Sequence, residues 1–68
     1  MNEMKGTIVR WFTYRGFGFI EPEEGEEDIF LHVTELKNSV EHPEGQEVEF
    51  EVEPSWKGPR AVNVKVLN

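Results

Sequence analysis

Residues 15–20 read Arg-Gly-Phe-Gly-Phe-Ile and residues 29–33 read Ile-Phe-Leu-His-Val, and these two short apolar runs decide the fold. Side chains along a β-strand alternate between its two faces. If both runs are strands, each has an aliphatic face and an aromatic face. The aliphatic faces carry Ile20, Ile29, Leu31 and Val33. The aromatic faces carry Phe17, Phe19, Phe30 and His32.

The rest of the chain has the spacing of a small β-protein, because Gly and Pro interrupt it at short intervals. The predicted strands are residues 5–12, 16–21, 28–33, 46–53 and 60–67. Residues 34–37 are expected to form one helical turn capped by Thr34. Five strands with one long connection after the third predict an all-β fold, a five-stranded antiparallel Greek-key barrel of the OB type. We expect residues 1–68 to form a single domain.

The last two predicted strands supply a barrel interior. In the fourth, apolar residues alternate with glutamates, and in the fifth the valines alternate with other residues. The predicted inward side chains are Val48, Phe50, Val52, Val62, Val64 and Val66. Because a small barrel has one interior, we place the aliphatic faces inside and the aromatic faces outside. The alternative is that Phe19, or the whole aromatic set, closes one end of the barrel.

Length and composition exclude several classes of protein. A chain of 68 residues has room for one thin core and no deep pocket for a small-molecule substrate. Without cysteine it forms no disulfide and no thiolate metal site. His32 and His42 lack metal-ligand spacing, and no pattern indicates a nucleophile, so we expect no catalytic residue, no metal and no cofactor. With no membrane-length apolar run and no signal peptide, a cytoplasmic monomer is the expectation.

The charges are segregated along the chain. The formal net charge is −7, yet residues 4–20 and 54–68 contain no acid and three bases each. The segments 21–28 and 41–53 hold twelve of the fourteen acids. A plain solvated surface is one interpretation. The other is a local binding site for a polyanion, with the remote acids maintaining solubility.

The predicted exposed aromatics lie among the cations. Arg15 precedes Phe17, Arg10 adjoins Trp11, and Lys57 and Arg60 follow Trp56. Unpaired bases stack on exposed aromatic rings, each contributing about 1–3 kcal/mol, and phosphates bind Arg and Lys. A duplex hides its bases, so such a surface favours single strands.

Several motifs resemble those of the cold-shock proteins of bacteria and archaea, over nearly the whole chain. They are Lys5-Gly6-Thr7, Trp11-Phe12, residues 15–20, residues 29–34, Glu44-Gly45-Gln46 and residues 57–64. The two central motifs match the RNP1 and RNP2 signatures of that family. The resemblance implies an OB-type barrel that binds single-stranded RNA and single-stranded DNA with little sequence selectivity and acts as an RNA chaperone.

By motif, the resemblance implies stacking residues and cations. The implied stacking residues are Trp11, Phe17, Phe19, Phe30 and His32, and the implied cations are Arg15 and Lys57. An ungapped comparison would place Arg10 at the family's Trp position. We prefer Trp11 there, with a β-bulge absorbing one extra residue.

The chain also departs from the family pattern. Val33 stands where an aromatic usually follows the histidine, which implies fewer stacked bases or weaker binding. Tyr14 and Trp56 occupy loop positions that are often polar, and they are candidate replacement stacking surfaces. Trp56 could instead be a loop anchor packed over the barrel mouth. The competing function is a protein-interaction domain that uses the same aromatic face.

Overall fold

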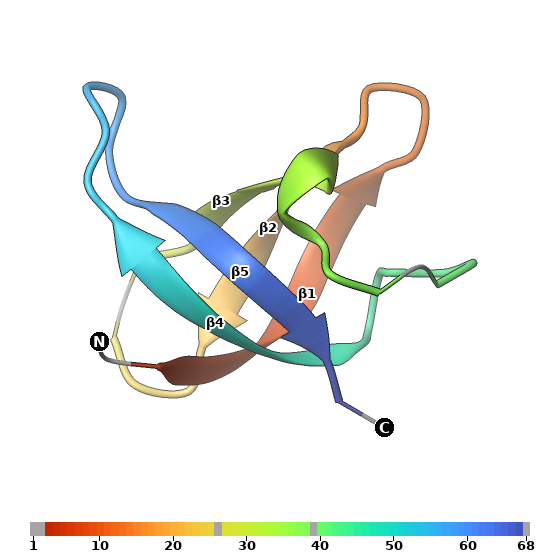
Figure 1. Ribbon diagram of the computed structural model, residues 1–68, viewed down its shortest axis with the longest axis horizontal. Coiled ribbons are helices and arrows are strands. Elements are labelled where there is room, and N and C mark those ends of the chain that lie inside the picture. The colour runs from red at the N-terminus through yellow and green to blue at the C-terminus, as the bar shows by residue number, and fades with distance from the viewer. Residues whose placement is uncertain (1–2, 26, 39, 68) are drawn as a thin grey trace.

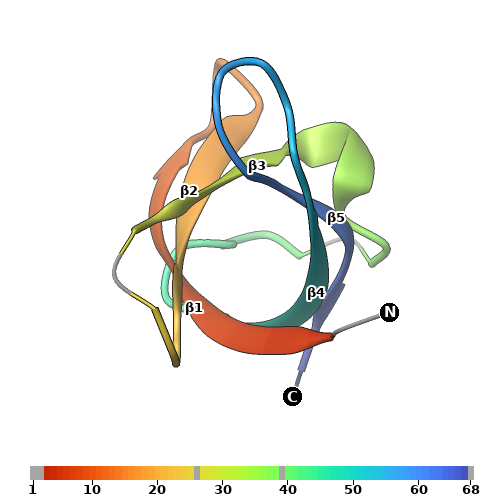
Figure 2. The same ribbon diagram turned by 90° about the vertical axis from the view of Figure 1, so that its left-hand side faces the viewer.

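The computed structural model describes residues 3–25, 27–38 and 40–67, and its five strands close into a barrel (Figures 1 and 2). The strands are β1 (Met4–Phe12), β2 (Phe17–Pro22), β3 (Ile29–His32), β4 (Glu47–Glu53) and β5 (Arg60–Val66). A short 3-10 helix, η1 (Val33–Glu35), follows β3. The all-β, five-stranded barrel of the OB type is therefore confirmed. Within the described ranges, no helix is long and apolar enough to cross a membrane.

The strand order around the barrel is β1-β2-β3-β5-β4. β1 pairs antiparallel with β2 and β4, β2 with β3, and β4 with β5. The junction between β3 and β5 is parallel, through the pair Phe30 and Arg60. An odd number of strands cannot alternate in direction around a closed ring, so a barrel of five cannot be antiparallel at every junction.

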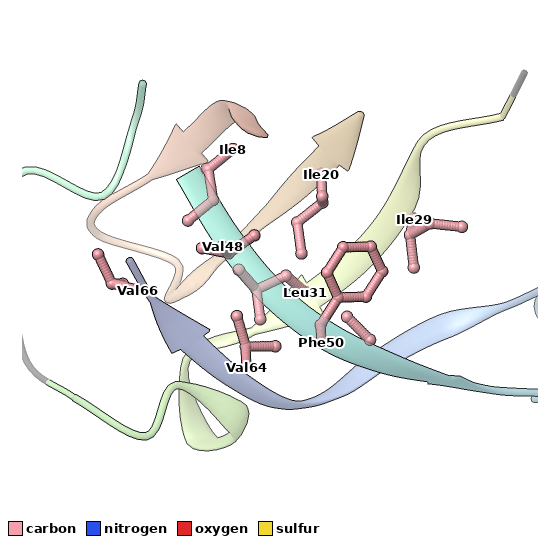
Figure 3. Packing of buried hydrophobic residues seen from close by; sticks show 9 residues of the cluster. Ile8, Ile20, Ile29, Leu31, Val48, Phe50, Val64 and Val66 are labelled. Carbon is pink, nitrogen blue, oxygen red and sulfur yellow. The ribbon is translucent and has the colours of Figure 1, made fainter. Parts of the chain in front are cut away.

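Aliphatic side chains fill the interior, with one aromatic ring (Figure 3). The buried core consists of Ile8, Ile20, Ile29, Leu31, Val48, Phe50, Ala61, Val64 and Val66. Burying these side chains is the main favourable term for a domain without disulfides. The predicted placement of the aliphatic faces inside the barrel is confirmed.

Three valines predicted in the core lie elsewhere. Val33 is 44% exposed because β3 ends at His32. Val52 is 37% exposed because it lies near the end of β4, where the β4–β5 hairpin extends beyond the barrel (Figure 1). Val62 is only half-buried, and Ala61 beside it is buried instead.

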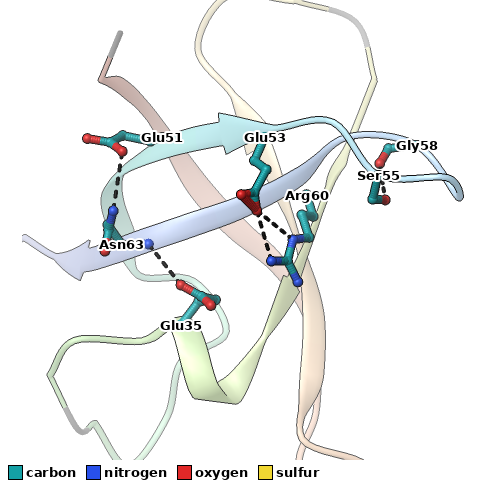
Figure 4. A network of polar contacts seen from close by, with 7 residues as sticks. All are labelled: Glu35, Glu51, Glu53, Ser55, Gly58, Arg60 and Asn63. Atoms are coloured by element: carbon teal, nitrogen blue, oxygen red, sulfur yellow. Dashed lines mark hydrogen bonds and ion pairs between the residues drawn. The ribbon is translucent and has the colours of Figure 1, made fainter. Parts of the chain in front are cut away.

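A bulge in β5 causes the exchange of Ala61 and Val62. The β4–β5 register shifts between Glu49 and Glu51, and Asn63 has a left-handed φ of 53°. An extra residue in one strand reverses the alternation of faces beyond it. Side-chain carboxylates hold this turn of the backbone (Figure 4): the Asn63 N–H donates to Glu35 Oε1 at 3.2 Å, and Asn63 Nδ2 donates to Glu51 Oε1 at 3.2 Å.

The helical turn after β3 also differs from the prediction. It begins at Val33, and its N-cap is His32 rather than Thr34. The Thr34 N–H donates to His32 Nδ1 at 3.3 Å, and Thr34 Oγ1 lies 2.9 Å from the same nitrogen. An imidazole nitrogen thus takes the place of the expected hydroxyl cap. Farther along, the Asn38 side chain pairs with the Val66 backbone, which ties the long connection to β5.

Candidate nucleic-acid interface

The outer face of the barrel carries two rows of side chains that run across the strands. Residues paired across neighbouring strands direct their side chains to the same face. The first row is Arg10, Phe19, Phe30, Arg60 and Glu53, from β1, β2, β3, β5 and β4. The second row is Phe12, Phe17 and His32, from β1, β2 and β3. The pairing therefore places an aromatic pair between two arginines and a second aromatic row beside it.

The rings of these rows contact one another, and together we call them the aromatic platform: Phe12, Phe17, Phe19, Phe30 and His32. The ring centroid of Phe17 lies 5.1 Å from that of Phe12, 6.2 Å from that of Phe19 and 5.7 Å from that of Phe30. The Phe30 centroid lies 6.0 Å from that of Phe19 and 6.5 Å from that of His32. These spacings are those of interacting aromatic pairs.

The platform is open to solvent although its rings pack together. Phe17, Phe19 and Phe30 are half-buried, and Phe12 and His32 are exposed. The buried side chains of the same strands, such as Ile20 and Leu31, lie on the opposite face. None of the platform rings fills the barrel interior, so the alternative in which they close its end does not apply.

Trp11 does not lie on this platform, and here the preferred placement is wrong. The β1–β2 register shifts between Ile8 and Arg10, so the expected bulge is present. It nevertheless leaves Arg10 opposite Phe19 and turns Trp11 to the inner face opposite Gly18. A Cβ built on Gly18 would stand 2.6 Å from Trp11 Cε3, which shows that the indole packs directly over this glycine.

Phe12 is the platform residue that sequence reasoning missed. It pairs with Phe17 across the β1–β2 turn and is 37% exposed. Counting outward from that turn would have found it, because the two residues that flank a hairpin turn share a face. The prediction instead takes Trp11 as the stacking residue of this strand from the family motif, and Phe12, the next residue along the strand, faces the opposite side.

The β1–β2 turn carries two of the predicted residues. Tyr14 and Arg15 are exposed, with Tyr14 fully so. Two hydrogen bonds stabilise the turn: the Phe12 carbonyl accepts from the N–H groups of Arg15 and Gly16, at 3.0 and 2.9 Å. It therefore presents a phenol and a guanidinium next to the Phe12 end of the platform.

Trp56 lies in the β4–β5 loop and is 91% exposed, so it is not an anchor packed over the barrel mouth. The Nζ of Lys57 lies 5.1 Å from the centroid of the Trp56 ring, within the range of a cation–π contact. Reciprocal backbone hydrogen bonds between Ser55 and Gly58, at 3.0 and 2.9 Å, define the turn. The Ser55 hydroxyl also donates to the Gly58 carbonyl (Figure 4). The loop thus projects an aromatic ring and a cation.

A hollow lies between this loop and the Phe19, Phe30 and Arg60 side chains of the first row. Its walls are Phe19, Phe30, Ser55, Trp56, Lys57, Gly58, Pro59 and Arg60. Predicted residues from three strands and one loop therefore meet here. Arg60 is also paired: its Nη2 lies 2.8 Å and its Nε 3.0 Å from Oε1 of Glu53 (Figure 4).

Acidic residues occupy a different part of the surface. The outer side chains of β4 include Glu47, Glu49 and Glu51, all exposed or half-buried. Among the described residues, no three His, Cys, Asp or Glu side chains are arranged to hold a metal ion. Apart from Glu53, the residues of the two rows are cationic, aromatic or imidazole, so the chain concentrates stacking surfaces and cations on one face.

Comparisons with known proteins agree with this geometry. Residues 4–67 match the family model described as the 'Cold-shock' DNA-binding domain. The chain is 45% identical over 69 residues to the cold shock-like protein CspB of Yersinia pestis, covering 97% of each chain. It is 44% identical over 70 residues to the cold shock-like protein CspE of Escherichia coli, covering 98% of this chain and 100% of the relative.

A solved structure has the same fold. The chain titled drosophila Unr CSD456 superposes with a TM-score of 0.84 at 32% sequence identity, over 98% of this chain and 27% of that one. Cold-shock domains generally bind nucleic acids and are not known as enzymes. The family match spans nearly all of the sequence, and the solved structure shares the fold. The chain therefore belongs to the cold-shock domain family of nucleic-acid-binding proteins.

Proposed function

We propose that this protein binds single-stranded RNA and single-stranded DNA by stacking unpaired bases on the aromatic platform, with little overall sequence selectivity. The observation that carries the proposal is the continuous set of solvent-open rings with centroids 5.1–6.5 Å apart on the outer face of β1, β2 and β3. A base presents a π-face whatever its identity, so stacking gives affinity without strong selectivity.

The surrounding cations would meet the phosphates. Arg10 lies at one end of the first row, Arg15 lies in the adjoining turn, and Lys57 lies in the β4–β5 loop. These groups border the platform on several sides, so a strand whose bases lie on the rings would pass its backbone close to them. Tyr14 and Trp56 extend the stacking surface at the two loops.

Binding of this kind supports an RNA chaperone role. A protein that binds unpaired bases and not duplex shifts the pairing equilibrium toward open strands by mass action. The protein would act as a monomer, because the platform and both flanking loops belong to one chain. A monomer that binds a few bases at a time also releases them readily, which allows RNA to refold.

Tryptophan fluorescence tests the proposal. The Trp11→Phe variant leaves Trp56 as the reporter beside the platform, and it is titrated with oligo-U, oligo-dT and a duplex of matched length. We expect quenching by both single strands at concentrations where the duplex has little effect. Equal affinity for duplex and single strands would exclude the stacking mechanism. No binding to any oligonucleotide would favour the protein-interaction alternative.

A further inference from the structure

The hollow beside the β4–β5 loop combines aromatic walls with a hydrogen-bonding edge. Phe19 and Phe30 of the platform line it together with Trp56 and Pro59 of the loop, and Arg60 also lines it. Phe30 and Arg60 are the residues through which β3 pairs with β5, so their side chains leave the sheet on the same face. A flat ring held against Phe30 would therefore have its edge next to the Arg60 guanidinium.

Arg60 is held in a defined orientation. Its Nε and Nη2 both donate to Oε1 of Glu53, at 3.0 and 2.8 Å. A guanidinium has five N–H donors in a rigid plane, so this contact uses one edge of the group. The structure gives the guanidinium no other hydrogen bond within residues 3–25, 27–38 and 40–67. The edge formed by Nη1 and Nη2 remains available to a ligand.

That free edge offers two parallel N–H donors, so it binds best to a group with two neighbouring acceptors. Guanine has such a pair in O6 and N7, whereas adenine has a donor beside N7. Cytosine also carries two neighbouring acceptors, but its smaller ring offers less area to a slot with aromatic walls. Arg contacts to O6 and N7 of guanine are the commonest specific contacts between proteins and bases in DNA.

We propose that this hollow is a guanine subsite, in which the base stacks on Phe30 beneath Trp56 and Arg60 donates to its O6 and N7. The inference rests on the proposed single-strand binding and adds one selective position to an otherwise tolerant platform. Glu53 is a positioning residue, since it holds the guanidinium without contacting the base. The expected ligand is a single strand with one guanine among other bases.

Arg10 provides a matched control for this proposal. It flanks the same aromatic pair at the other end of the first row, opposite Phe19. Within the described residues it makes no ion pair to a carboxylate, in contrast to Arg60. The same Arg→Lys substitution at the two ends therefore separates base recognition from general attraction to phosphate. Lys keeps the positive charge but loses the planar fork.

The experiment measures dissociation constants for oligo-U strands that carry one central guanine, adenine, cytosine or 7-deazaguanine. The wild type should bind the guanine strand at least about fivefold more tightly than the adenine strand. The 7-deazaguanine strand, which lacks the N7 acceptor, should lose most of that advantage. Arg60→Lys should bring the guanine-to-adenine ratio close to one, and Glu53→Ala should lower it. Arg10→Lys should change the affinity for all four strands by the same factor and leave the ratio unchanged.

Several results would overturn the proposal. They are equal binding of guanine, cytosine and adenine strands by the wild type, an unchanged affinity for 7-deazaguanine, and an Arg60→Lys variant that keeps the wild-type ratio. If oligo-U and its variants all bind but without discrimination, the guanine subsite fails while single-strand binding stands. If none of the strands binds, the proposed function itself fails. Thermal melts of the variants establish that each one is folded before its ratio is interpreted.

Discussion

At the scale of single residues, two kinds of phenylalanine occur in this barrel. Phe50 is 1% exposed and is one of the largest fully buried side chains of the core. Phe17 and Phe30 are half-buried and contact chiefly other rings of the platform. The same side chain therefore fills the core in one place and is open to contact with a ligand in the other.

We predict that Phe17→Ala and Phe30→Ala each weaken binding of oligo-U by about 1–3 kcal/mol, the usual contribution of a stacked base. Their cost in unfolding free energy should be smaller than that of Phe50→Ala, which should lose about 3–5 kcal/mol because it leaves a cavity in the core. Thermal melts and oligonucleotide titrations of the three variants measure both quantities. Platform variants that unfold as readily as Phe50→Ala would reverse the assignment of inner and outer faces.

At the scale of strands, a bulge decides which side chains of β5 face inward. Asn63 has a left-handed φ of 53°, and its side chain and N–H bond to carboxylates of two other segments. Asn tolerates this conformation better than most residues, and β-branched residues tolerate it poorly. The bulge therefore depends on this residue as well as on the packing of Ala61 and Val64.

Substitution of Asn63 tests this dependence. Asn63→Val should lower the unfolding free energy by about 1–2 kcal/mol because valine is strained at this left-handed backbone position. Losing the hydrogen bond from the Asn63 side chain to Glu51 should lower it further. Asn63→Gly should cost less, since glycine adopts the same φ without strain. Urea denaturation of the wild type and both variants gives the comparison. Equal midpoints for the Val and Gly variants would mean that the backbone strain is not significant.

At the scale of the whole molecule, the charge distribution limits how strongly phosphates are attracted. The net charge is −7, and Glu53 neutralises Arg60. Of the four cations described around the platform, three then remain to meet a strand: Arg10, Arg15 and Lys57. Binding should consequently depend more on stacking than on charge.

The salt dependence of oligo-U binding should therefore be shallow. About 0.7 counterions are released per phosphate contact on single strands. Three contacts therefore give a slope of about −2 for log K plotted against the logarithm of the salt concentration. The surrounding acids should reduce it further. Titrations over a range of KCl concentrations measure the slope. A slope twice as steep would reveal a basic surface that the three cations do not account for.

The sequence alone determined the fold class and the face of β2 and β3 that carries the aromatic residues. Period-two alternation in residues 15–20 and 29–33 placed Ile20, Ile29 and Leu31 inside and the aromatic residues outside. Local patterns sufficed because each of these strands is regular across its length, so a face can be counted from any residue within it.

Tertiary structure decided the residues that lie beyond an irregularity. A bulge in β1 put Arg10 and Phe12 on the outer face and Trp11 on the inner face, and one in β5 exchanged Ala61 and Val62. A sequence can suggest an extra residue, as it did before Trp11. The side chains that turn inward are settled only when neighbouring strands pair and the core packs, because one inserted residue reverses every face after it.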